Sequence, residues 1–249
     1  MKDMQKFNIN GDAPSIGGWL TTFNPVVAEA MAICGFDWIA IDMEHGPADE
    51  ASAPSIFMAL ELCGVAPVVR LPSADPYLAR RMLDLGAMGL IVPVTESAGA
   101  FEDFARHCLY PPVGHRGAGL SRVNKWGAFF DSYVAGFRPV LIPQIETKEG
   151  ISAAASIAAL ECVDGLFVGP YDLSANLGAP GDFCTFEFTT AIKLIQEACK
   201  DSGKASGIHQ VAPDMKALKE KLTEGYQFVA FGTDMIAMQS AFGGLSDLK

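Results

Sequence analysis

The sequence predicts an α/β protein of the (β/α)8 TIM-barrel class, and three observations carry that prediction. The chain has 249 residues, which suits one barrel of about 250 residues better than two domains. Eight short, continuously apolar runs alternate with helix-like segments, as strands buried on both faces require. Polar residues gather just after these runs, at the barrel end where active sites form. A doubly wound sheet is the main rival architecture.

The expected strands are short and each is followed by a helix-like segment. The strands span Ile16–Leu20, Asp37–Ile41, Ala66–Leu71, Gly89–Val94, Val140–Ile145, Gly165–Val168, Ala205–Ile208 and Phe228–Phe231. The helices span Pro25–Cys34, Glu50–Cys63, Asp75–Leu85, Ala98–Cys108, Lys148–Leu160, Phe186–Asp201, Pro213–Glu224 and Asp234–Phe242. Asp75 and Pro76 supply an N-cap and a proline at the first helical position. Glycines follow three helices, where a left-handed residue is favoured: Gly64, Gly86 and Gly225.

The whole chain, residues 1–249, is predicted to form one domain. Residues 1–14 form an N-terminal extension, and residues 109–138 form a long connection before the fifth strand. This connection is rich in Gly, Pro and Arg, and long loops in compact domains are usually functional or disordered. We expect it on the same side as the polar strand ends, as a lid or a subunit contact. An ordinary surface loop is an equal alternative.

Composition excludes several classes of function. The formal net charge of -11 argues against a nucleic-acid partner, because phosphate backbones require clustered Lys and Arg. The six cysteines form no C-x-x-C pair, which fits reduced thiols and a cytoplasmic location. The polar N-terminus lacks an apolar signal region, and no apolar run reaches about 18 residues, so no membrane span is expected.

Two acids at strand ends are the first candidates for chemistry. Glu146 follows the fifth strand, and Asp172 follows the sixth, one strand–helix unit later. Carboxylates without a nearby Cys or paired His suit Mg²⁺ or Mn²⁺ better than Zn²⁺. A metal held by two protein ligands keeps open positions, where the carboxylate and ketone oxygens of a 2-oxo acid bind. The alternative is that Glu146 caps the following helix and Asp172 caps a turn.

A cation and an acid–imidazole pair are expected at the same end. Arg70 ends an apolar strand, so it must pair with a barrel carboxylate or face an anionic ligand. Its fork of donors suits the charge that develops on an enolate oxygen. His45 follows Asp42 by three residues, and a neighbouring carboxylate would fix its tautomer and raise its basicity. The alternative for His45 is a structural role.

Five motifs resemble the HpcH/HpaI aldolases, a family of class II, metal-dependent pyruvate aldolases. They are Gly18-Trp19-Leu20, Ile41-Asp42-Met43-Glu44-His45-Gly46-Pro47, Val69-Arg70-Leu71, Gln144-Ile145-Glu146-Thr147 and Gly169-Pro170-Tyr171-Asp172-Leu173-Ser174. The resemblance covers about Ile16 to Phe242. It implies a barrel of the phosphoenolpyruvate/pyruvate-binding type, whose last helix is exchanged between subunits of a homohexamer.

The resemblance also implies a reaction: reversible cleavage of a 4-hydroxy-2-oxo acid to an aldehyde and pyruvate, or hydroxypyruvate, through an enolate. Glu146 and Asp172 would bind the divalent metal (Mg²⁺ or Mn²⁺, with Co²⁺ as a further candidate). Trp19 and Gln144 would contact the substrate, and Arg70 would stabilise the enolate.

Further roles follow from the same resemblance. His45, oriented by Asp42, would manage proton transfer, and Asp84 would serve the active site of a neighbouring subunit. The backbone N–H groups of Tyr171 and Asp172 would hold the substrate carboxylate.

The chain departs from the family pattern at two positions. Tyr171 stands where many members have a small residue, and His209 stands where an aliphatic one is expected. We expect both to line the aldehyde side of the pocket and to favour small or polar aldehydes. The alternative is that both point away from it.

Other functions of the same scaffold stay open. One alternative is another enolate-forming lyase, such as a 2-oxo-acid decarboxylase or a CoA-ester lyase. A CoA-ester lyase would need a basic patch for the adenine phosphates, which this acidic chain does not obviously offer. The other alternative is a non-catalytic protein that binds 2-oxo acids. The Asp42–His45 pair argues against it, because a binding protein needs no catalytic base. No lysine lies at an expected strand end, which argues against a Schiff-base route.

Overall fold

The computed structural model describes residues 7–11, 13–47 and 49–245 and shows a closed parallel barrel. Its strands are β1 (Ser15–Leu20), β2 (Trp38–Asp42), β3 (Ala66–Arg70), β4 (Gly89–Val92), β5 (Val140–Ile145), β6 (Gly165–Val168), β7 (Ala205–Gln210) and β8 (Phe228–Phe231). Each strand pairs with the next, and β8 pairs with β1 in register Ile16 to Val229. The predicted barrel is therefore confirmed, and closure excludes the open doubly wound sheet.

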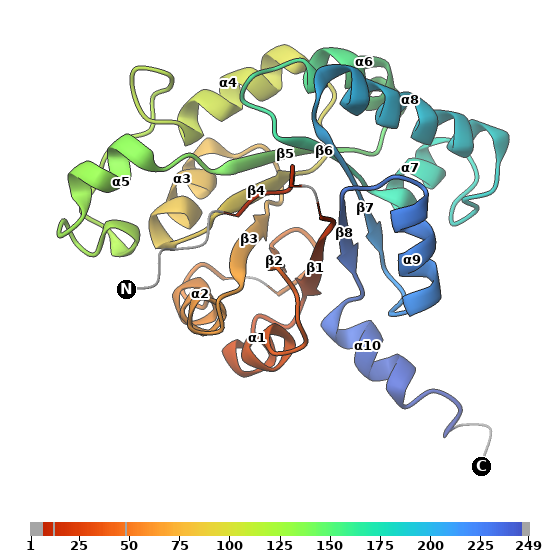
Figure 1. Ribbon diagram of the computed structural model, residues 1–249, viewed down its shortest axis with the longest axis horizontal. Coiled ribbons are helices and arrows are strands. Elements are labelled where there is room, and N and C mark those ends of the chain that lie inside the picture. Colours follow the sequence, from red (N-terminus) through yellow and green to blue (C-terminus); the bar gives the residue numbers. More distant parts are fainter. Residues whose placement is uncertain (1–6, 12, 48, 246–249) are drawn as a thin grey trace.

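Helices surround the barrel, as Figure 1 shows. They are α1 (Pro25–Ala32), α2 (Ala53–Leu62), α3 (Pro76–Leu85), α4 (Ala98–Cys108), α5 (Phe130–Gly136), α6 (Lys148–Ala158), α7 (Pro170–Asn176), α8 (Phe186–Ser202), α9 (Met215–Thr223) and α10 (Asp234–Ala241). The Asp75 carboxylate accepts hydrogen bonds from the N–H groups of Tyr77 and Leu78, so the predicted N-cap of α3 is confirmed. Among the described elements, α5, α7 and the 3₁₀ turn η1 (Arg122–Asn124) were not expected.

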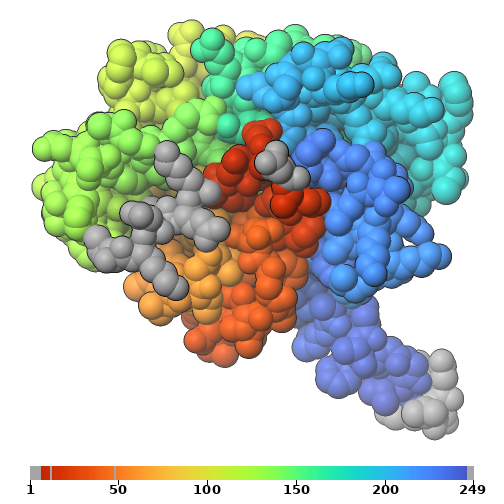
Figure 2. Space-filling model, viewed as in Figure 1, coloured from red at the N-terminus to blue at the C-terminus, as the bar shows by residue number. Residues whose placement is uncertain are grey.

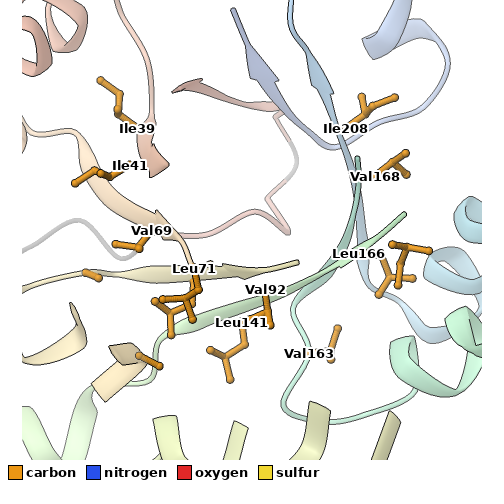
Figure 3. Packing of buried hydrophobic residues seen from close by; sticks show 14 of the residues in the cluster. Ile39, Ile41, Val69, Leu71, Val92, Leu141, Val163, Leu166, Val168 and Ile208 are labelled. Carbon is orange, nitrogen blue, oxygen red and sulfur yellow. The ribbon is translucent and has the colours of Figure 1, made fainter. Parts of the chain in front are cut away.

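Two apolar layers hold the barrel together. Outward-facing strand residues pack beneath the helices, including Ile41, Val69 and Leu141, as Figure 3 shows. Inward-facing residues fill the barrel itself, with Trp38 and Phe228 completely buried. A Cβ atom on Gly17 would lie 2.2 Å from the Trp38 ring. The large ring therefore requires a glycine on the neighbouring strand, which is the close packing expected of a filled barrel.

The long connection, residues 109–138, lies at the end of the barrel opposite to the one expected. It leaves the C-terminal end of α4 and enters the N-terminal end of β5. Its Arg122 donates a hydrogen bond of 2.7 Å to the carbonyl of Leu85, at the C-terminal end of α3, and pairs with Glu61 near the end of α2. The prediction that it sits on the active-lip side is wrong, because helix-to-strand connections of a barrel gather at the N-terminal ends of the strands. It is not a lid over its own subunit's strand ends.

The last helix, α10, projects away from the barrel and buries none of its residues (Figure 2). Met235, Met238 and the following Phe242 are exposed. Its start is nevertheless well anchored, because the Asp234 carboxylate accepts hydrogen bonds from the backbone and hydroxyl groups of both Thr21 and Thr22. Within the described ranges, no helix is long and apolar enough to cross a bilayer.

Candidate active site

The carboxyl ends of neighbouring strands bring the expected polar residues to one lip of the barrel. Asp42 is the last residue of β2 and Arg70 the last of β3, and the two stand directly opposite each other in the parallel ladder. Gln144 lies in β5, and Glu146 follows that strand directly. All four are buried, Glu146 at 4% exposure. Apolar strands thus deliver four polar side chains to a place from which water is largely excluded.

Asp42 is the centre of a dense hydrogen-bond network. Its Oδ1 accepts from Arg70 Nε at 3.0 Å and from the backbone N–H groups of Glu44 and His45. Its Oδ2 accepts from Arg70 Nη2 at 2.6 Å and from Trp19 Nε1 at 3.0 Å. Burial alone would raise the pKa of Asp42, but the hydrogen bonds and charge of Arg70 outweigh it and hold that pKa below its ordinary value. Asp42 is therefore an ionised anchor for Arg70.

The structure gives Asp42 a different relation to His45 from the one expected. The carboxylate contacts the backbone of His45, and no hydrogen bond joins it to the imidazole among the described contacts. The His45 side chain is exposed at the lip. Asp42 therefore shapes the turn that presents His45, while its direct side-chain partners are Arg70 and Trp19.

Arg70 is shared between two carboxylates. Its Nη1 lies 2.6 Å from Glu44 Oε2, in addition to the forked contact with Asp42. The Trp19 ring supports the guanidinium from below, with 5.2 Å between Cζ and the ring centroid. Burial raises the pKa of Glu44 even though the charge of Arg70 lowers it. No role for Glu44 was predicted from the sequence, although it stands in the same short turn as Asp42 and His45.

Glu146 lies in a tight pocket of hydrogen-bond donors. Its Oε1 accepts from the backbone N–H of Val94 at 2.7 Å, and its Oε2 accepts from Gln144 Nε2. A Cβ atom at position 169 would lie 2.4 Å from Glu146 Oε2, so only glycine leaves room for this carboxylate. Burial raises the pKa of Glu146, and these two hydrogen bonds only partly offset that effect. The helix cap that follows is Thr147, so the capping alternative for Glu146 is wrong.

Asp172 stands in the first turn of α7 rather than in a loop. Its side chain is exposed and makes no hydrogen bond to any residue that the structure describes. It lies close enough to Glu44 and Glu146 for its negative charge to raise the pKa of both. The alternative role of Asp172 as a turn cap therefore finds no hydrogen bond to support it.

The oxygen atoms at this lip fit a hard divalent cation. Gln144 Oε1 is buried beside Glu146 without a hydrogen-bond partner among the described residues, and Asp172 is free to contribute a carboxylate. No described lysine, arginine or histidine forms an ion pair with Glu146 or Asp172. No described group of three His, Cys, Asp or Glu side chains could hold a metal by itself. A cation here would therefore have an all-oxygen set of few protein ligands and several open positions.

Trp19 and His209 lie beneath the lip, in contact with each other. Trp19 is only 2% exposed, and its ring centroid lies 4.5 Å from that of His209. His209 Nε2 donates to the carbonyl of Gly232 at 3.4 Å, and burial lowers the pKa of His209 to about 4. The imidazole is therefore neutral at neutral pH. Trp19, expected to contact substrate, supports the guanidinium of Arg70.

Tyr171 and Asp84 are not brought into this network. The Tyr171 side chain is exposed and packs edge-on against Phe183 at 5.2 Å between ring centroids. Asp84 lies near the C-terminal end of α3, at the opposite end of the barrel. It pairs with Arg116 at 2.7 Å between Oδ1 and Nη2, inside an aromatic cage that includes Tyr110. Asp84 therefore does not serve the active site of its own subunit.

Comparisons with known proteins agree with the fold of this chain. A family model described as HpcH/HpaI aldolase/citrate lyase matches residues 15–241. A 5-keto-4-deoxy-D-glucarate aldolase from Klebsiella pneumoniae is 38% identical over 234 residues, which cover 93% of this chain and 91% of that protein. A family protein from Burkholderia cenocepacia has a similar structure, with TM-score 0.88, 34% identity and coverage of 96% and 95% of the two chains. An HpcH/HpaI aldolase from Desulfitobacterium hafniense gives TM-score 0.85 at 25% identity, with coverage of 95% and 93%.

Proposed function

The chain belongs to the HpcH/HpaI aldolase/citrate lyase family and is an aldolase, and we propose that Glu146 and Asp172 hold the divalent metal on which its activity depends. Members of this family are typically metal-dependent. The observation that supports the proposal most is the buried, unpartnered Gln144 Oε1 beside a buried Glu146 that has no cationic partner among the described residues. Glu146 and Asp172 would hold a Mg²⁺ or Mn²⁺ ion, which would supply Lewis-acid polarisation of the substrate ketone.

The residues around this position have complementary tasks. Arg70 keeps donor capacity beyond its bonds to Asp42 and Glu44, because a guanidinium has five N–H groups. It would donate to the ketone oxygen and stabilise the enolate as the C3–C4 bond breaks. Gln144 would orient the pyruvate part of the substrate. His45, exposed at the lip, would take the proton of the 4-hydroxyl group, directly or through water.

Two further observations support the mechanism. The backbone N–H groups of Tyr171 and Asp172 have no hydrogen-bond partner among the described residues, so they are available to a substrate carboxylate. None of the eight strands contains a lysine, so no strand supplies an amine for a Schiff base. Both fit cleavage through a metal-assisted enolate rather than through a covalent imine.

The relatives suggest the first substrate to test. Two curated relatives at 38% and 36% identity are named 5-keto-4-deoxy-D-glucarate aldolase. We therefore propose a hydroxylated 4-hydroxy-2-oxo acid of this sugar-acid kind as the substrate, with His209 and Tyr171 on the aldehyde side. We also propose a cytoplasmic homohexamer in which α10, exposed along its length, packs on a neighbouring copy.

An aldehyde panel tests the function. The metal-free protein is incubated with pyruvate or hydroxypyruvate and a series of aldehydes, with Mg²⁺, with Mn²⁺ and with EDTA. The proposal predicts aldol products with either metal and none with EDTA. Turnover that persists without metal would contradict the metal-dependent mechanism. Tight pyruvate binding with no product from any aldehyde would favour a non-catalytic binding protein. Decarboxylation of oxaloacetate without any aldol product would favour a 2-oxo-acid decarboxylase.

A further inference from the structure

Arg70 has one partner that is fixed and one that is not. Asp42 is fixed, because Trp19 Nε1 and two backbone N–H groups hold its carboxylate independently of Arg70. The Glu44 carboxylate has no partner among the described residues except Arg70 Nη1, at 2.6 Å. Glu44 is also the more accessible, with its side chain 20% exposed against 4% for Asp42. Breaking the contact between Arg70 and Glu44 therefore breaks no other hydrogen bond that the Glu44 carboxylate makes to a described residue.

The contact occupies a group that the substrate needs. Nε and Nη2 of Arg70 donate to Asp42, so Nη1 is the guanidinium nitrogen that Asp42 does not contact. Glu44 Oε2 accepts from this nitrogen. The second N–H of Nη1 has no partner among the described residues, but an anionic oxygen of a 2-oxo acid that approaches it would lie beside the Glu44 carboxylate and be repelled by its charge.

The surrounding charges favour a move of Glu44 when a cation arrives. The negative charges of Asp42 and Asp172 act on Glu44 and raise its pKa, whereas Arg70 and His45 lower it, and Glu44 in turn raises the pKa of Glu146. Among the described residues, Arg70 forms ion pairs only with Asp42 and Glu44, so the carboxylates of Glu146 and Asp172 lack a cationic partner. A divalent cation between Glu146 and Asp172 would add two positive charges within reach of Glu44. A carboxylate beside such a cation accepts hydrogen bonds from the water molecules bound to it. These water molecules would replace Arg70 as hydrogen-bond donors to Glu44.

We propose that Glu44 is a latch: it occupies Arg70 Nη1 in the metal-free protein and releases it when a divalent cation binds at Glu146 and Asp172. The inference rests on the proposed function, because it assumes that Arg70 and the cation serve the same 2-oxo acid. Glu44 is a positioning residue in this scheme. The latch predicts an order of binding, cation first and 2-oxo acid second, because the acid meets Arg70 without the competing charge of Glu44 only after the cation is in place.

Substitution of Glu44 tests the latch without an aldehyde. Glu44→Gln removes the charge, and Glu44→Ala removes the acceptor as well and serves where the amide disturbs folding. Glu50→Gln is the matched control, since it also removes a Glu–Arg pair, that with Arg81, but leaves Arg70 untouched. Pyruvate binding to the metal-free proteins is measured by calorimetry, and Mn²⁺ binding by electron paramagnetic resonance.

The latch predicts opposite effects on the two ligands. Metal-free Glu44→Gln should bind pyruvate about fivefold more tightly than the wild-type protein, and Glu44→Ala at least as tightly, because a competing ion pair of ordinary strength is gone. Mn²⁺ should bind about fivefold more weakly to both, because one attracting charge is lost. Glu50→Gln should change neither affinity.

The latch is overturned if metal-free pyruvate affinity in both Glu44 variants stays equal to or falls below that of the wild-type protein. A fall would mean that Glu44 supports Arg70 instead of restraining it. Unchanged Mn²⁺ affinity would also overturn it. These are binding measurements, so a protein that shows both effects but forms no product with any aldehyde would contradict the proposed function and leave the latch standing.

Discussion

Replacement of Asp42 by asparagine should destabilise the protein strongly, although the two side chains have nearly the same shape. An asparagine oxygen at the position of Oδ1 keeps its three hydrogen bonds, from Arg70 Nε and two backbone N–H groups. The amide NH₂ would replace Oδ2, so it would face two donors, Trp19 Nε1 and Arg70 Nη2. Arg70 would remain buried, with its side chain 7% exposed, and Glu44 as its remaining carboxylate.

The size of the effect follows from these contacts. Removing one partner of a buried ion pair costs about 3–5 kcal/mol, and we expect the lower end, about 3 kcal/mol, because Glu44 still compensates Arg70. For a chain of this length that corresponds to a fall in Tm of about 10 °C. Urea denaturation followed by circular dichroism measures the free energy of unfolding directly. Glu50→Gln, which breaks an ion pair whose arginine is 66% exposed, should cost less than about 1 kcal/mol.

The stability lost in Asp42→Asn should also depend on pH, in a direction that the pKa of Asp42 determines. The pKa of Asp42 is depressed in the folded protein, so its contribution to stability is fully present above its unfolded pKa, about 4. The stability difference between the wild-type protein and Asp42→Asn should therefore be constant near neutral pH and shrink as the pH falls through the folded pKa of Asp42. A loss below about 1 kcal/mol at pH 7 would refute the account of Asp42 as the anchor of Arg70.

Three further predictions concern neighbouring residues. Glu146→Gln should leave the metal-free protein equally or more stable at pH 7, because it removes a buried charge. Added Mn²⁺ should raise the Tm of the wild-type protein but not that of this variant. If Mn²⁺ also raises the Tm of Glu146→Gln, Glu146 is not a metal ligand. The pKa of His209, depressed to about 4, implies that this residue alone removes about 2 kcal/mol of stability between pH 7 and pH 5. In urea titrations at the two pH values, the change in stability should therefore be about 2 kcal/mol less unfavourable in His209→Leu than in the wild-type protein. Tyr171→Ala and His209→Leu should each alter the ratio of kcat/KM between small polar and larger apolar aldehydes, and identical profiles in all three proteins would show that neither side chain lines the pocket.

The strands were predictable because each is a short apolar run buried on both faces. The structure lengthens β7 to Gln210, so His209 lies within a strand rather than after it. Helix α7 was missed because seven residues, with Pro170 and Asp172 among them, are too short to show a helical period. The position of the long connection was also predicted wrongly, although the alternation of strands and helices determines it: a segment between a helix and the next strand lies away from the lip.

The members of the site were easier to predict than their contacts. A residue at the end of an apolar strand must lie at the lip, which is why Asp42, Arg70 and Glu146 were found together. Spacing along the chain cannot show which atom meets which, so Asp42 was paired with the imidazole of His45 instead of with Arg70 and Trp19. Glu44 lies in a turn, where no periodic pattern of apolar residues indicates which way its side chain points. Its contact with Arg70 is therefore visible only in the folded structure.

The central claim is that a cation held at Glu146 and Asp172 lets Arg70 and its neighbours form the enolate of pyruvate. Proton exchange at the pyruvate methyl group tests this without any aldehyde. Pyruvate in D₂O is followed by proton nuclear magnetic resonance with the protein and Mg²⁺, and again after EDTA. We predict loss of the methyl signal with Mg²⁺ and its persistence with EDTA or in Glu146→Gln. A methyl signal that persists in the wild-type protein with saturating Mg²⁺, or exchange that continues in EDTA, would contradict the account.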